Sequence, residues 1–359
     1  MKTKETKLTI YDIAQELQIS IATVSRALNG KEDVSEDTRK KILEAAEEMG
    51  YKASKTAASL SRKEKRFAAL FPDLIHDYDK EVRRGIQKAL VDLQDYHVSM
   101  EMLTIPSEPA AFAERLQEMA YLGYDGVLLV PPEGEKILSE RIRQLNLGKM
   151  AVVTMTTDLD KDGRLFTVQS NGLVAGRMAG ELLGMVLGRG KKVALVTGQL
   201  TSQVHIRTAE GFLAEVERQG FSFAGIYEHH DMPQRAYTLA EKLMKEHPDL
   251  DGIYMATANS VAFCNHLVEM GYGGKLKIVA SDVFPQMIDF LKSGLVLATI
   301  FQNPYTQGRL ATKYLFEYLT EGRKFEGTEI LLDPQIVLKS NLELYEKKLR
   351  GAMNEDILI

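Results

Sequence analysis

Two stretches of the sequence contain residue types that could bind a phosphate or a metal. The segment LGRGKKVALV is similar to a phosphate-binding loop, but that motif requires a glycine where Met185 stands and a serine or threonine where Lys192 stands. It also precedes a predicted strand instead of following one, so we interpret it as a turn between a helix and a strand. His229, His230 and Asp231 could ligate a metal, yet adjacent histidines in a strand point to opposite faces. We expect a solvated strand end there.

Other catalytic patterns are missing from the sequence. It contains no Gly-x-Ser-x-Gly elbow and no histidine pair spaced for zinc. Cys264 is the only cysteine, which excludes intrachain disulfides and cysteine-cluster metal sites, and we expect it to be buried as a small apolar residue. The sequence therefore predicts a protein that is not an enzyme, with no catalytic residues, no metal and no cofactor.

Residues 9–30 predict two short amphipathic helices joined by a tight turn. Thr9 followed three residues later by Asp12 fits a capping box at the start of the first helix. Ile13, Ala14 and Leu17 then recur at helical spacing on one face. This arrangement is typical of a helix-turn-helix.

The second helix begins at Ser20, a good N-cap, and ends at Gly30, while Ile19 fills the angle between the helices. Two such helices bury little apolar surface, so a third should complete the core, beginning at Ser35 and ending before Gly50. The apolar positions, at steps of three and four residues, are Val24, Ala27 and Leu28 in the second helix and Ile42, Leu43, Ala46 and Met49 in the third.

The charge is distributed unevenly along the chain. Residues 1–66 contain 14 Lys and Arg against 11 Asp and Glu, a local net charge of +3, whereas the whole chain carries −5. A basic segment in front of an acidic body favours a nucleic-acid-binding module, although the difference is modest.

The segments TIYDIAQELQISIATVSRALNG and VSEDTRKKILEAAEEMGY closely resemble the N-terminal domain of the LacI/GalR family of bacterial transcriptional repressors. The resemblance implies that the second helix enters the major groove of DNA. It implies base-reading roles for Ile21, Ala22 and Arg26, of which Arg26 can donate to O6 and N7 of guanine together. It implies contacts with the DNA backbone for Thr9, Ser20, Thr23, Ser25 and Asn29.

The segment after Tyr51 departs from the family pattern. The family usually has a Pro-Asn pair there, followed by a hinge helix, whereas this chain has Ala53 and Ser54. Ala57 and Leu60 match the hinge, and the resemblance implies that Leu60 acts as a wedge in the minor groove. The basic residues that follow suit a segment near phosphates: Arg62, Lys63, Lys65 and Arg66.

From residue 67 onward, short β-rich runs such as FAALFP, GVLLVPP and KVALVTG alternate with segments of helical period. This alternation predicts parallel sheets covered by helices, over a length suited to two domains. It also resembles the family's effector-binding core, a two-lobed α/β fold like that of periplasmic sugar-binding proteins. We therefore expect a three-helix helix-turn-helix domain at 1–53, a hinge and linker at 54–66, and a core at 67–345. Its lobes would be 67–169 with 303–333 and 170–302 with 334–345, followed by a tail at 346–359.

The sequence also predicts where the protein works. The segment MKTKETKL has no apolar stretch typical of a signal peptide, and no run approaches the roughly 18 apolar residues of a membrane helix. We therefore expect a cytoplasmic protein with no membrane partner.

The resemblance implies a small-molecule effector in the cleft between the lobes. Asp282, Asn259 and Gln302 match positions of the family's ligand contacts, and Arg207 looks like its ligand arginine, although it lies four residues before Gly211-Phe212 instead of the usual three. Aromatic residues near strand ends are candidates for stacking on a sugar ring: Phe71, Tyr78 and Phe284. A sugar, sugar acid or sugar phosphate is favoured over a purine.

Taken with the resemblance, the sequence predicts a DNA-binding transcriptional regulator, and specifically a repressor. It would bind a pseudo-palindromic operator as a homodimer, because one helix-turn-helix reads only a half-site. The apolar residues of the C-terminal segment span only two heptads, too few to predict a coiled coil and a tetramer. The alternative is a carbohydrate-binding or carbohydrate-processing α/β protein with a helical appendage.

Overall fold

The computed structural model describes residues 9–28, 34–49, 64–73, 77–132, 134–159 and 163–349. They fall into two compact units: a helical unit that ends at Glu64 and an α/β unit that holds most of the remaining chain.

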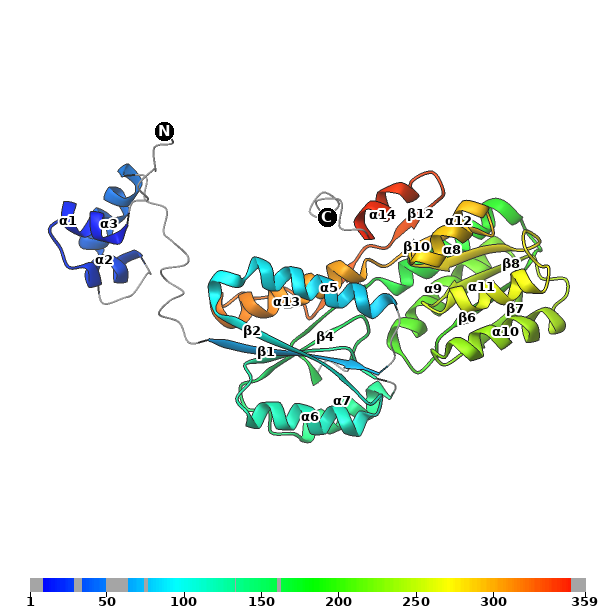
Figure 1. Ribbon diagram of the computed structural model, residues 1–359, viewed down its shortest axis with the longest axis horizontal. Coiled ribbons are helices and arrows are strands. Elements are labelled where there is room, and N and C mark those ends of the chain that lie inside the picture. The colour runs from blue at the N-terminus through cyan, green and yellow to red at the C-terminus, as the bar shows by residue number, and fades with distance from the viewer. Residues whose placement is uncertain are drawn as a thin grey trace. The chain divides into compact units, whose positions relative to one another are not determined.

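The described residues of the helical unit form three helices, which are drawn in blue in Figure 1. They are α1 (Ile10–Glu16), α2 (Ile21–Leu28) and α3 (Glu36–Glu48). Their shared core is built from the positions that helical spacing predicts, including Ile13, Val24 and Ile42, which are fully buried. Ile19, in the turn between α1 and α2, packs against this core as expected. Gln18 turns the chain there with φ of 52°.

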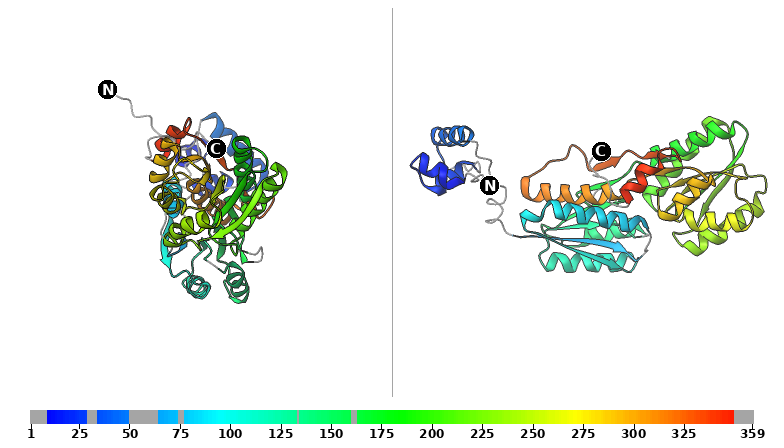
Figure 2. Two further views of the ribbon diagram at one scale, coloured as in Figure 1. Left: turned by 90° about the vertical axis from the view of Figure 1, so that its right-hand side faces the viewer. Right: turned by 45° about the horizontal axis from the view of Figure 1, so that its top comes forward.

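The first lobe of the α/β unit has a sheet with the strand order β11-β5-β4-β3-β1-β2, in which every pair is parallel. In Figures 1 and 2, two helices run side by side along one face and two others cover the opposite face. The strands are β1 (Lys65–Pro72), β2 (Val98–Ile105), β3 (Gly126–Leu129), β4 (Ala151–Met155), β5 (Phe166–Ser170) and β11 (Glu329–Leu332). The helices are α5 (Asp77–Asp92) with α13 (Pro304–Glu321), and α6 (Pro109–Tyr121) with α7 (Glu135–Gln144); η1 (Gln94–Tyr96) precedes β2.

The second lobe repeats this architecture around a sheet with the order β12-β10-β9-β8-β6-β7, parallel except for the edge strand β12. Helices cover both faces, and an apolar cluster lies on each side of the sheet. The strands are β6 (Lys192–Thr197), β7 (Ser222–Glu228), β8 (Gly252–Ala256), β9 (Lys277–Ser281), β10 (Val296–Phe301) and β12 (Gln335–Val337). The helices are α8 (Gly172–Leu187), α9 (Gln203–Gln219), α10 (Pro233–Glu246), α11 (Ser260–Glu269), α12 (Pro285–Ser293) and α14 (Leu342–Leu349).

The chain passes between the two sheets three times: after β5, after β10 and between β11 and β12. The inner strands of both sheets are almost entirely buried, so in the sequence they are continuous apolar runs instead of alternating ones. Their carboxyl ends and the loops that follow them supply the polar residues described below.

A close helix crossing fixes the position of α9, whose first turns border the cleft. Glycines recur every four residues along the face of α8 that meets α9. A Cβ atom at Gly176 would lie 2.1 Å from the carbonyl oxygen of Thr208, and one at Gly211 would lie 2.1 Å from that of Leu173. The two backbones therefore approach at a distance that only glycine permits.

Two segments differ from the sequence-based expectation. Lys65 and Arg66, which we expected in the linker near phosphates, belong to β1. The Nζ atom of Lys65 lies 2.6 Å from Oδ1 of Asp125, and the guanidinium of Arg66 donates to the carbonyl of Leu122 and stacks on Tyr124. The predicted tail boundary after residue 345 falls inside α14, a helix that packs its first turns against the second lobe.

Candidate functional site

One face of α2 is exposed and carries the three predicted base-reading residues. Ile21, Ala22 and Arg26 are exposed, whereas Val24 and Ala27 on the opposite face are buried against α1 and α3. Ile21 keeps 38% of its surface exposed, although a residue so apolar usually packs inside. The helix thus presents an apolar start followed by a guanidinium, which is a surface suited to reading base edges in a major groove.

The residues predicted to contact the DNA backbone are positioned by caps. Asp12 accepts hydrogen bonds of 2.7 Å from both the backbone N–H and the hydroxyl of Thr9, and the Thr9 hydrogen bond lowers the pKa of this carboxyl. The Ser20 hydroxyl accepts from the backbone N–H of Thr23 at 3.1 Å. Ser25 is half-buried. Of the remaining predicted contacts, Asn29, Ala57 and Leu60 lie outside the described residues.

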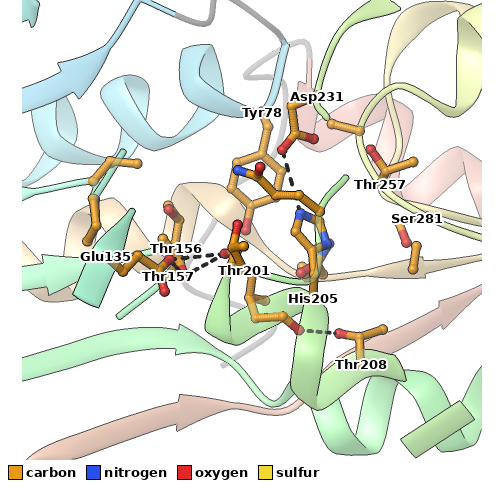
Figure 3. A pocket seen from close by; sticks show the side chains of 18 of the residues that line it. Tyr78, Glu135, Thr156, Thr157, Thr201, His205, Thr208, Asp231, Thr257 and Ser281 are labelled. Atoms are coloured by element: carbon orange, nitrogen blue, oxygen red, sulfur yellow. Dashed lines mark hydrogen bonds and ion pairs between the residues drawn. The ribbon is translucent and has the colours of Figure 1, made fainter. Parts of the chain in front are cut away.

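A second candidate site is a cleft between the two lobes of the α/β unit (Figure 3). Its walls come from the carboxyl ends of parallel strands in both sheets and from the first turns of the helices that follow them, which is where open α/β sheets bind ligands. The polar side chains that line it are Tyr78, Asp79, Glu135, Thr156, Thr157, Gln199, Thr201, Ser202, His205, Thr208, Asp231, Tyr254, Thr257, Ser281 and Gln302.

Glu135 connects the two lobes across this cleft. It stands in the first turn of α7, and its Oε1 atom accepts from the hydroxyls of Thr157, at 2.5 Å, and Ser202, at 3.0 Å. Its Oε2 atom accepts from the backbone N–H of Gln203, the first residue of α9, at 3.0 Å. Burial raises the pKa of Glu135 to about 7, although these three hydrogen bonds act to lower it.

His205 and Asp231 face one another at the other side of the cleft, as Figure 3 shows. The Nε2 atom of His205 lies 3.8 Å from Oδ2 of Asp231, and its Nδ1 atom shares a hydrogen bond of 3.0 Å with the Thr197 hydroxyl. Both side chains crowd Gly198, where a Cβ atom would lie 2.5 Å from the Asp231 carboxylate. Burial lowers the pKa of His205, because a buried site disfavours the charged imidazolium, while the nearby Asp231 acts to raise it.

The neighbouring histidines differ from the solvated strand end that we predicted. His229 is fully buried, and its two ring nitrogens have no hydrogen-bond partner within the described part of the chain. Burial lowers its pKa to about 4. His230 is exposed, with φ of 53°. Both residues follow β7, which ends at Glu228, so the prediction that they lie in a strand is wrong. Tertiary packing covers one ring and leaves the other exposed.

Of the residues predicted to bind the effector, Gln302 and Tyr78 line the cleft. The backbone N–H and the side-chain Nε2 of Gln302 both donate to Asp282 at 2.8 Å. The Tyr78 hydroxyl accepts from Nε2 of Gln307, which also donates to the Gln302 carbonyl. These bonds connect α5 of the first lobe to the crossover that follows β10.

Asp282 itself lies behind the cleft wall. It is fully buried, with φ of 62°, and burial raises its pKa to about 7 while its hydrogen bonds with Gln302 oppose that rise. The structure places it outside the lining, where it fixes the Gln302 amide. Its neighbour Ser281 is the residue of this strand end that reaches the cleft.

The other predicted effector residues do not line the cleft. Arg207 is 47% exposed and its guanidinium lies 3.9 Å from Glu329. Phe71 is buried beneath the guanidinium of Arg83, 3.7 Å from its ring centre. Two further residues are buried at the N-caps of α11 and α12: Asn259 and Phe284.

The position three residues before Gly211-Phe212 is Thr208, which does line the cleft and donates its hydroxyl to the Val204 carbonyl at 2.8 Å. Sequence reasoning also missed the residues that follow strands β3, β4, β6 and β7. The feature of the sequence that could have identified them is their position, because each is a polar residue that comes soon after the carboxyl end of a strand. These residues are Glu135, Thr156, Thr157, Thr201, Ser202, His205 and Asp231.

Within the described residues, no helix has the length and apolar character needed to cross a bilayer. The same part of the chain holds no group of three or more His, Cys, Asp or Glu side chains arranged to bind a metal ion.

The fold and cleft define a two-lobed α/β ligand-binding protein, joined to a helix-turn-helix unit. Family comparison agrees: the periplasmic binding protein domain matches residues 67–324, and the helix-turn-helix of the bacterial regulatory proteins of the lacI family matches residues 9–54. The chain therefore belongs to the proteins that join a lacI-family helix-turn-helix domain to a periplasmic-binding-protein domain.

Several curated relatives are named as regulators. The HTH-type transcriptional regulator pepR1 of Lactobacillus delbrueckii subsp. lactis is 25% identical over 93% of this chain and 97% of its own length. Catabolite control protein A of Staphylococcus aureus (strain Mu50 / ATCC 700699) is 26% identical over 59% of this chain, and the match spans 62% of that relative.

Solved structures share the fold of the α/β unit. A glucose-galactose binding protein from Geobacillus stearothermophilus superposes with a TM-score of 0.70 at 24% identity, covering 78% of this chain and 99% of that one. A solute-binding protein from Burkholderia graminis C4D1M, in complex with D-arabinose, gives a TM-score of 0.71 at 22% identity, covering 78% and 97%.

Proposed function

We propose that this protein is a DNA-binding transcriptional regulator that represses its target genes and responds to a carbohydrate held in the cleft of the α/β unit. It binds a pseudo-palindromic operator as a homodimer, because one helix-turn-helix covers only one half-site and a two-fold dimer presents two.

The observation that carries the DNA-binding half of the proposal is the exposed face of α2. The large apolar side chain of Ile21 keeps 38% of its surface exposed on the same helix as the exposed Arg26, while the opposite face of that helix packs in the three-helix core. In a major groove, Ile21 and Ala22 contact apolar groups such as a thymine methyl, and Arg26 reads guanine.

The effector half rests on the chemistry of the cleft. A polyol needs hydrogen-bond donors and acceptors alternating over a small surface, and the lining supplies hydroxyls, amides and carboxylates from both lobes. Related proteins of this fold are described as binding glucose, galactose and arabinose. A ligand that touches both lobes stabilises their closed arrangement, which gives it a means to bias the DNA-binding state.

The proposal is tested with the full-length protein and DNA selected from a random pool. We expect the selected fragments to contain an inverted repeat, and binding measured by fluorescence anisotropy to fall steeply with salt, because phosphate contacts release counterions. Sedimentation velocity should give a dimer on the selected fragment. A monomer both free and on DNA, or selection without an inverted repeat, would contradict the proposal.

A second candidate function is a carbohydrate-binding or carbohydrate-processing protein with a helical appendage, which the cleft alone would equally support. That function predicts weak, sequence-independent DNA binding that Arg26→Ala does not alter. The matched control is Gln15→Ala, an exposed position on α1. Equal effects of the two substitutions on discrimination between operator and random DNA would favour the second candidate.

A further inference from the structure

The titratable side chains that line the cleft, apart from its tyrosines, are three carboxylic acids and one histidine. Asp79 and Glu135 come from the first lobe and Asp231 comes from the second. Among the described residues that form the lining there is neither a lysine nor an arginine, and the one basic side chain is His205. Burial lowers the pKa of that histidine and so disfavours a positive charge on it.

Two arginines that lie close in sequence to Asp79 and His205 make contacts outside the cleft. Arg83, one turn after Asp79 on α5, stacks on Phe71 and donates to the Thr104 hydroxyl at 2.7 Å. Its charge interacts with Asp79, so that carboxylate is partly compensated. Arg207 pairs with Glu329 and stands outside the lining.

Asp231 is the least compensated of the three acids. Within the described residues its one ion-pair contact is with His205, whose charged form burial disfavours, and 21% of its side chain remains exposed. A carboxylate accepts hydrogen bonds and donates none, so this residue binds a group that brings its own hydrogen, such as a hydroxyl or an ammonium.

The remaining polar lining suits uncharged hydroxyl groups. Hydroxyl side chains reach the cleft from both lobes, and each can accept hydrogen bonds from a ligand. They are Tyr78, Thr156, Thr157, Thr201, Ser202, Thr208, Tyr254, Thr257 and Ser281. The hydroxyls of Thr157, Ser202 and Thr208 already donate their hydrogen within the protein. The negative charge of a phosphate or carboxylate placed here would be repelled by the negative charge of the lining carboxylates. Among the described lining residues, no lysine or arginine supplies a positive charge to balance this repulsion.

We infer that the cleft takes an uncharged or amine-bearing carbohydrate and rejects sugar phosphates and sugar acids. This inference rests on the proposed carbohydrate effector and narrows its class. The Asp79 and Asp231 carboxylates, one from each lobe, select against anions and accept hydrogen bonds from the ligand's hydroxyl or ammonium groups.

The test compares derivatives that share one carbon skeleton. Full-length protein is titrated by calorimetry at pH 7.5 with glucose, glucosamine, glucose 6-phosphate and gluconate, and then with the matching galactose and arabinose series. For the skeleton that binds, we expect the phosphate and the acid to bind at least about tenfold more weakly than the uncharged sugar, while an amine derivative binds comparably or more tightly. A phosphate or acid that binds as tightly as its uncharged parent would overturn the inference.

Two substitutions test the cause of the selectivity. Asp231→Asn and Asp79→Asn keep the size of each side chain and remove its charge. We expect either substitution to reduce the ratio of the affinity for the uncharged sugar to that for the phosphorylated sugar by about tenfold. Asp289→Asn, at an exposed position of α12, is the matched control and should leave this affinity ratio unchanged. An affinity ratio that stays at the wild-type value in both cleft variants would overturn the electrostatic reasoning.

The outcome can be separated from failure of the proposed function. Binding of the inverted-repeat DNA by anisotropy reports the regulator role without any ligand. If DNA binds and no carbohydrate of any charge does, the effector class is wrong while the DNA-binding role stands. If an anionic sugar binds best, the carbohydrate effector stands and the charge selectivity is wrong.

Discussion

Replacing Glu135 with glutamine should change how the stability of the α/β unit depends on pH. An ordinary glutamate has a pKa near 4.5, whereas burial raises that of Glu135 to about 7. At 1.36 kcal/mol per pH unit, this difference corresponds to about 3 kcal/mol. The folded protein therefore binds this proton more tightly than the unfolded chain does.

The sign follows from which state holds the proton. Below pH 4.5 Glu135 is protonated in both the folded and the unfolded state, so its ionisation does not affect the free energy of unfolding. As the pH rises from about 4.5 to 7, the free energy of unfolding declines because the unfolded chain releases the proton first. Above pH 7 Glu135 is ionised in both states, and the buried carboxylate destabilises the folded protein by its full amount. A glutamine at this position accepts from the Gln203 N–H through its amide oxygen and donates to the hydroxyls of Thr157 and Ser202 through its two amide hydrogens. A protonated glutamate has one hydrogen, so it donates to one of these hydroxyls and accepts from the other.

We therefore expect Glu135→Gln to match the wild type within about 1 kcal/mol at pH 5 and to exceed its stability by about 3 kcal/mol at pH 8. Urea unfolding followed by circular dichroism measures this, since the chain has no tryptophan for fluorescence. Asp282, whose pKa is also raised to about 7, titrates in both proteins and cancels in the comparison. Glu140→Gln, at an exposed position of α7, is the control. A stability difference that does not change with pH would refute the argument.

Three further predictions concern packing, DNA reading and the cleft. Gly176→Ala places a Cβ atom 2.1 Å from a backbone carbonyl oxygen and should cost about 1–3 kcal/mol of stability by thermal unfolding, whereas Gly273→Ala, with no atom within 4 Å of its Cβ, should not. Arg26→Ala should lose about 1–3 kcal/mol of base discrimination per half-site, measured by competition between operator fragments with single base changes. Asp282→Ala should abolish the thermal stabilisation given by the ligand while operator affinity stays within twofold of wild type, because the two functions reside in separate units. Retained stabilisation in this variant would mean that the cleft does not need the amide that Asp282 holds.

The elements of this protein could be predicted from the sequence because each is specified locally. Thr9 and Asp12 form their cap within one helical turn, and the spacing of Ile13, Val24 and Ile42 marks the faces that become the core of the helical unit. The apolar runs that became β1, β3 and β6 were recognisable because parallel strands buried on both faces contain few polar residues.

The direction in which side chains point was decided by tertiary structure. Each step along a helix turns the side chain by about 100°, so a one-residue difference from a family pattern sends Arg207 toward Glu329 and places Thr208 in the cleft. His229 and His230 follow the end of β7 instead of lying in it, and tertiary packing buries the first while the second stays exposed. Glu135 lies 68 residues before the Gln203 N–H that it caps. That contact exists because the two lobes meet, and no local pattern in either segment specifies it.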